Sequence, residues 1–136
     1  MSHTRRLLSL GLLVLLTLAT GVHAQSPSCA AMQPGQAVAH EMLTVSTTPI
    51  GFTAATITSN AAIAAYITME GGSMRYLPVG TPSATVGHLA DPPSGGNAGT
   101  GSGSWICGQP TLLSLRMIRT GSTDVVLRVT YYKQYP

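Results

Sequence analysis

Hydrophobic and polar residues alternate most regularly near the end of the chain. Over Asp124–Lys133, every second position holds Val, Leu, Val and Tyr, and the positions between them hold Val, Arg, Thr and Tyr. A period of two residues is typical of a β-strand that buries one face. The segment Thr111–Thr120 also has the character of a strand, and Gly121-Ser122 is a turn between the two. We therefore expect a hairpin with one buried face at this end of the chain.

Shorter segments of the same kind occur upstream. β-branched residues with loose alternation predict further strands, at His40–Thr47, Phe52–Thr58, Ala62–Glu70, Met74–Val79 and Ala84–Leu89. The alanines of the third segment also favour helix, but a strand is preferred, and Gly71-Gly72 is expected to close a hairpin into the fourth. The pattern predicts an all-β fold with a single antiparallel β-sandwich, for which a jelly roll is a candidate topology.

The first 24 residues have the three-part build of a secretory signal peptide. Arg5-Arg6 precede an apolar run over 7–22, and Ala24 ends a small-residue cleavage site ahead of Gln25. The run contains Ser, Thr and Gly and is weak for a permanent membrane helix, which needs about 20 apolar residues. We expect a signal-peptide helix over 1–24 that is cleaved, with an uncleaved anchor as the alternative. The mature protein would then be secreted or periplasmic, without a permanent membrane anchor.

The rest of the chain is expected to form one domain. Residues 25–39 are rich in Ser, Pro, Ala and Gln and predict a flexible linker, so ordered structure should span 40–136. Within it, residues 94–104 read SGGNAGTGSGS, which predicts a mobile glycine-rich surface loop. The two cysteines, Cys29 and Cys107, predict one disulfide if the chain reaches an oxidising compartment.

Charge and motifs exclude several classes of function. Beyond Ala24 the chain keeps five basic and four acidic residues, a balance that does not indicate a nucleic-acid partner. His88 lies three residues before Asp91 and His40 is next to Glu41, but neither pair has the spacing of a zinc motif. Neither a phosphate-binding loop nor the Gly-x-Ser-x-Gly elbow of a serine hydrolase is present. We expect no catalytic residue, no metal and no cofactor.

Aromatic side chains are the best candidates for a contact surface, because rings supply contact area at low entropic cost. The candidates are Tyr76, Trp105, Tyr132 and Tyr135. Trp105 lies two residues before Cys107, so packing on the disulfide and contact with a partner are both open. Such a surface would bind a protein or a glycan.

Several stretches between about Val45 and Tyr132 resemble small β-proteins encoded among the virion genes of tailed phages and prophages. The matching stretches are Thr47–Thr56, Met74–Tyr76, Gly80–Leu89 and Arg116–Thr123 leading into Leu127–Tyr132. The resemblance implies a non-enzymatic structural or surface-binding module that self-associates or docks to the surface of a particle. An exported carbohydrate- or cell-surface-binding domain is the alternative. A translation start at Met32, without the signal, is a further alternative.

Overall fold

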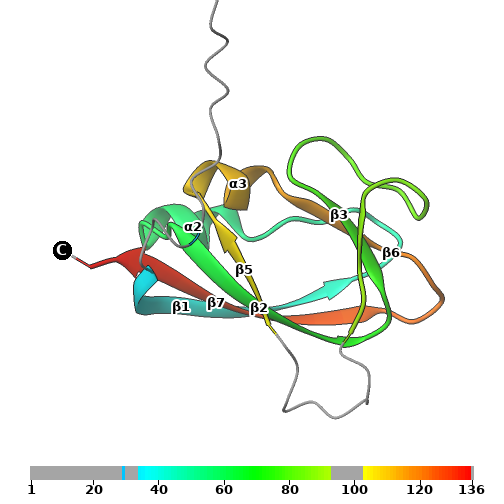
Figure 1. Ribbon diagram of the computed structural model, residues 1–136, viewed down its shortest axis with the longest axis horizontal. Helices are drawn as coiled ribbons and strands as arrows, with labels where there is room; N and C mark the ends of the chain where they lie inside the picture. Colours follow the sequence, from blue (N-terminus) through cyan, green and yellow to red (C-terminus); the bar gives the residue numbers. More distant parts are fainter. Residues whose placement is uncertain (1–28, 30–33, 93–102, 136) are drawn as a thin grey trace, which may run out of the picture.

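The computed structural model describes Cys29 and residues 34–92 and 103–135, and the chain is mostly β with two antiparallel sheets (Figure 1). The predicted signal peptide, most of the predicted linker and nearly all of the glycine-rich loop lie outside these residues. The strands are β1 (Pro34–Val45), β2 (Ala64–Gly71), β3 (Met74–Leu77), β4 (His88–Ala90), β5 (Ser104–Cys107), β6 (Arg116–Arg119) and β7 (Val125–Gln134). Two short helices are α2 (Ala54–Ser59) and α3 (Gln109–Ser114). In the described part of the chain, no helix is long and apolar enough to cross a membrane.

The larger sheet has the strand order β1-β7-β2-β5 and confirms the predicted alternation of β7. Val125, Leu127, Val129 and Tyr131 are each at most 1 % exposed, whereas Arg128 between them is exposed. β7 is antiparallel to β1 on one side and to β2 on the other. The strand with the clearest amphipathic pattern therefore lies inside the sheet, where one of its faces forms the core.

The smaller sheet has the order β4-β3-β6 and contributes to the same core. Met74 of β3 and Met117 of β6 are in one buried cluster with Ile67 of β2 and Leu127 of β7. Figure 1 shows α2 and α3 together at one end of the four-stranded sheet. Each helix supplies one buried apolar side chain to that cluster, Ile57 from α2 and Leu112 from α3.

Both helices replace predicted strands. The predicted strand Phe52–Thr58 overlaps α2, in which Ile57 is the one buried side chain. An element with a single buried side chain shows too little periodicity to distinguish a short helix from a strand. The alanines of this segment favour a helix. In the other segment, Thr111–Thr120, the first half is α3 and only the second half is β6. Pro110 lies in the first turn of α3, where a helix tolerates the missing N–H.

Both predicted hairpins are wrong, because in each case the chain crosses from one sheet to the other. β2 belongs to the four-stranded sheet and β3 to the three-stranded sheet. β6 belongs to the three-stranded sheet and β7 to the four-stranded sheet. The two crossings pack against each other: a Cβ on Gly71 would lie 2.6 Å from the carbonyl oxygen of Asp124, and one on Gly72 would lie 2.7 Å from that of Thr123. Gly71-Gly72 therefore permits close approach of two backbones rather than a tight hairpin turn.

The ordered domain also begins earlier than predicted. β1 starts at Pro34, within the predicted linker of residues 25–39, and pairs along its whole length with β7. Ala37 is opposite Tyr132 and Pro34 is opposite Gln134, with irregular register near both. The backbone of the long β7 extends the pairing through a segment whose side chains show no strand pattern. One predicted strand is displaced along the chain. β4 starts at His88, near the end of the segment Ala84–Leu89 for which a strand was predicted.

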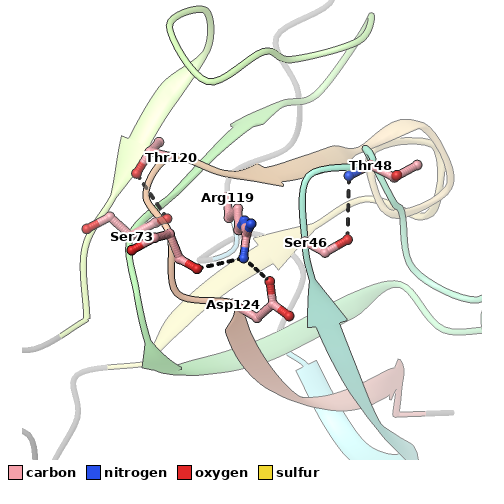
Figure 2. A network of polar contacts seen from close by, with 7 residues as sticks. Ser46, Thr48, Ser73, Arg119, Thr120 and Asp124 are labelled. Atoms are coloured by element: carbon pink, nitrogen blue, oxygen red, sulfur yellow. Dashed lines mark hydrogen bonds and ion pairs between the residues drawn. The ribbon is translucent and has the colours of Figure 1, made fainter.

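Polar contacts stabilise the region where the chain crosses between the two sheets (Figure 2). The Arg119 guanidinium donates to the Asp124 carboxylate at 2.5 Å and to the Ser122 carbonyl at 2.8 Å. Thr120 donates to the Ser73 carbonyl through both its backbone N–H, at 3.0 Å, and its hydroxyl, at 3.1 Å. The β2–β3 and β6–β7 connections are thus joined to one another by side chains as well as by close backbone packing.

Gly71→Ala is expected to lower the free energy of unfolding by about 2–4 kcal/mol, because it adds backbone strain to a steric clash. Gly71 has φ +92° and its new Cβ would meet the Asp124 carbonyl. Gly80→Ala is the matched control, since Gly80 has φ +93° with nothing within 4 Å of a Cβ. The control should cost only about 1 kcal/mol, from strain alone. Urea unfolding of both variants measures the difference, and equal losses would contradict the packing of the two crossings.

Tyr131 makes the free energy of unfolding depend on pH in the alkaline range. Burial, and secondly a hydrogen bond donated to the Glu41 carboxylate, hold the pKa of its hydroxyl well above the ordinary value of 10.0. The folded state therefore favours the neutral phenol, and this contribution is complete below pH 10 and is lost as the pH rises above it. The free energy of unfolding should fall by up to about 1.4 kcal/mol per pH unit there.

Urea unfolding between pH 8 and pH 11 tests this dependence. Tyr131→Phe should flatten the alkaline decline, at the cost of leaving the Glu41 carboxylate with the Thr53 N–H as its remaining donor. Tyr135→Phe is the control, because that ring is 67 % exposed and should leave the decline as it is. A decline unchanged by Tyr131→Phe would show that another group causes it.

Candidate functional site

Three aromatic rings gather on the outer face of the four-stranded sheet, and we call Tyr66, Trp105 and Tyr132 the aromatic cluster. The ring of Trp105 lies 5.2 Å from that of Tyr66 and 4.9 Å from that of Tyr132, between ring centroids. Each pair is tilted by 56°. Trp105 is 41 % exposed, so the cluster presents part of its largest ring to solvent.

The strand register explains why these three rings meet. Tyr66 of β2 is directly opposite Trp105 of β5, so both side chains point to the same face. Tyr132 of β7 is opposite Ala64, which leaves a small side chain where the larger rings converge. The neighbours Ala65 and Tyr131 are fully buried, and alternation therefore places the aromatic cluster on the face away from the core.

Local contacts hold the edge of the aromatic cluster. The backbone N–H of Gly103 donates to the hydroxyl of Tyr66 at 3.1 Å, and any side chain at Gly103 would collide with the Tyr66 ring. Two residues beyond Trp105, Cys107 is bonded to Cys29, which confirms the predicted disulfide. The ring partners of Trp105 are tyrosines, and it remains partly exposed. β5 is thus fixed by a glycine contact at one end and a disulfide at the other.

The predicted contact residues lie in three different places. Trp105 and Tyr132 are brought together, whereas Tyr76 lies in β3 of the other sheet with its ring 5.3 Å from that of His88. Tyr135 follows the end of β7 and is 67 % exposed, with its ring packed over Gly35. Tyr66 was not predicted as a contact residue, because its segment was ambiguous between helix and strand. The residue opposite it in the sheet also depends on strand pairing between distant parts of the chain. The outward position between Ala65 and Ile67 is the one signal that could have found it.

A cleft of about 320 Å³ opens between the two sheets, at the edge formed by β5 and β4. Ile67 and Ile106 line it from the four-stranded sheet, and Met74, Met117 and Tyr76 line it from the three-stranded sheet. Most of its lining residues are apolar, but polar and apolar atoms contribute about equally to its exposed wall, and Asp91 lies among the lining residues just after β4. Trp105 also borders the cleft, so it is shared by the cleft and the aromatic cluster.

The acidic groups of the described residues are mostly engaged in structural contacts. Asp124 pairs with Arg119, and Glu70 accepts a hydrogen bond from Arg128 at 2.8 Å, which lowers the pKa of the Glu70 carboxyl. Glu41 accepts hydrogen bonds from Tyr131 and Thr53. Within residues 34–92 and 103–135 with Cys29, no group of three or more His, Cys, Asp or Glu side chains is placed to hold a metal ion.

Comparisons with protein-family models, with curated proteins and with solved structures found no match for this chain. The resemblance to phage virion proteins therefore stays a prediction that rests on the stretches quoted for it.

Proposed function

We propose that the protein is a non-enzymatic, exported surface-binding module, built as a β-sandwich, that contacts another protein through the aromatic cluster. The observation that carries the proposal is the exposed Trp105 ring held between Tyr66 and Tyr132 on an outer sheet face. Tyrosine and tryptophan are enriched in protein interfaces, and they account for a large share of the residues that dominate binding energy. The shared core of the two sheets supports the sandwich architecture.

The geometry favours a protein partner over a glycan. A platform for stacking sugars needs exposed rings that lie in one plane, whereas each ring pair that includes Trp105 is tilted by 56°. Tilted rings form a surface of uneven height, which is suited to interdigitating with side chains.

Export is supported by the disulfide, since such bonds persist in oxidising compartments. The resemblance to virion proteins adds a particle surface, or a second copy of the chain, as the protein partner. Fractionating the native source into particles, periplasm or medium, and cytoplasm tests both parts of the proposal. Intact mass should show a chain that begins at Gln25 and gains two hydrogens on reduction.

Trp105→Ala tests the role of the aromatic cluster. It should weaken self-association, measured by sedimentation velocity, or co-sedimentation with particles, by about tenfold or more, as expected for a central interface tryptophan. Met42→Ala is the control on the same sheet face, because Met42 is 65 % exposed and lies away from the rings in β1.

Two results would overturn the proposal. The partner would be a glycan if the wild-type protein bound immobilised glycans but neither self-associated nor bound particles, and if Trp105→Ala abolished the glycan binding. If alanine at His40, His88, Glu70 or Asp124 removed an enzymatic activity without unfolding the domain, the protein would be an enzyme.

A further inference from the structure

The cleft between the sheets has the size of a small-molecule site. Its volume of about 320 Å³ lies at the lower end of the range of ligand pockets, roughly 300–1,000 Å³. An engineered apolar cavity of about 150 Å³ binds benzene, so this cleft would hold a ligand of about a dozen non-hydrogen atoms.

The walls of the cleft combine apolar side chains with polar atoms, which suits a molecule that has an apolar body and a polar head group. Three methionines, Met69, Met74 and Met117, line it together with isoleucine and leucine side chains. Methionine is unbranched and polarisable, and it adapts to ligands of irregular shape. Leu89 is also in the lining and is 52 % exposed, which leaves apolar surface at the rim. Filling the cleft would remove this apolar surface from water.

The charge at the cleft has a single sign. Asp91 is the one residue with a formal charge among the described lining residues, and it forms no ion pair with any residue that the structure describes. Tyr76 and Trp105 also border the cleft. An unpaired carboxylate at the cleft favours an ammonium group, which is attracted by the opposite charge.

We infer that the cleft binds a small apolar amine, with the hydrocarbon part between the sheets and the ammonium group at Asp91. The site shares Trp105 with the aromatic cluster, but its ligand is different and Asp91 and the three methionines belong to the cleft alone. The inference does not rest on the proposed protein partner, and its test uses Asp91, which lies outside the aromatic cluster.

Titration of the full-length, disulfide-bonded chain with phenylbutylamine, phenylbutanol and phenylbutyrate tests the inference. These probes share one apolar body and differ in the charge of the head group. Methyl NMR signals of Met69, Met74 and Met117 should shift on binding, whereas that of Met42 on the outer face should stay in place. At low salt the amine should bind about fivefold more tightly than the alcohol, and the carboxylate should bind most weakly.

Asp91→Asn separates the charge from the shape of the cleft. Asp91 is exposed, so the variant should fold, and it should bind amine and alcohol equally. Glu70→Gln removes an acid on the outer face of β2 and should keep the fivefold preference. The inference is overturned if no probe shifts the cleft methyls, if Met42 shifts with them, or if Asp91→Asn leaves the preference for the amine unchanged.

Discussion

Replacing Cys29 and Cys107 by alanine together is expected to lower the free energy of unfolding by about 4.5 kcal/mol. The disulfide joins residues 78 apart in sequence, and closing a loop of that length removes much conformational freedom from the unfolded chain. A loss of this size approaches the whole stability of many small domains. It corresponds to a fall in Tm of roughly 20 °C.

Thermal unfolding with and without reductant provides the measurement. The wild-type protein in reductant should match the double alanine variant, because both lack the same covalent link. Single replacement of Cys29 is informative as well, since it leaves Cys107 as a buried thiol at the end of β5. A fall in Tm of less than about 5 °C would contradict the expectation and indicate that the unfolded chain is already compact.

Leu127→Ala is expected to cost about 3–5 kcal/mol, from lost burial and from the cavity that remains. Leu127 is fully buried in the interior strand β7, opposite Leu43 of β1 on one side and Met69 of β2 on the other. Its neighbours are held by backbone pairing on both sides, so the site has little freedom to collapse around the missing atoms. The free energy of unfolding in urea measures the loss.

Val126→Ala is the matched control for Leu127→Ala. The two residues are adjacent in β7, but Val126 points to the outer face and is partly exposed. Its replacement should cost less than about 1 kcal/mol. Similar losses for the two variants would mean that β7 does not have the register described, because a one-residue slip exchanges the two faces of a strand.

The sequence predicted the class of fold better than its connections. The alternation in β7 and the β character of β2 and β3 follow from side-chain pattern, which is local information. The sheet to which each strand belongs is not local. Gly71-Gly72 is compatible with a tight turn, and only the close approach to Thr123 and Asp124 makes it a crossing between sheets. Likewise, β1 extends back to Pro34 because of its partner strand and not because of its own residues.

In the candidate site too, the features that depend on local sequence could be predicted and those that depend on long-range strand pairing could not. Trp105 and Tyr132 could be chosen as aromatic residues in strand-like segments, and the disulfide could be predicted from two cysteines. Tyr66 could not be added to them, since its position beside Trp105 depends on the pairing of β2 with β5. Tyr76 and Tyr135 resemble the others in sequence, yet their strand and their end of the chain place them elsewhere.

The position of β7 bears on when the domain can fold. β7 is the last of the described strands along the chain and lies between β1 and β2, so neither of these earlier strands gains that neighbour until β7 has been synthesised. Pairings such as Pro34 with Gln134 connect opposite ends of the domain and are slow to form. The four-stranded sheet therefore cannot assemble during synthesis until β7 has been made.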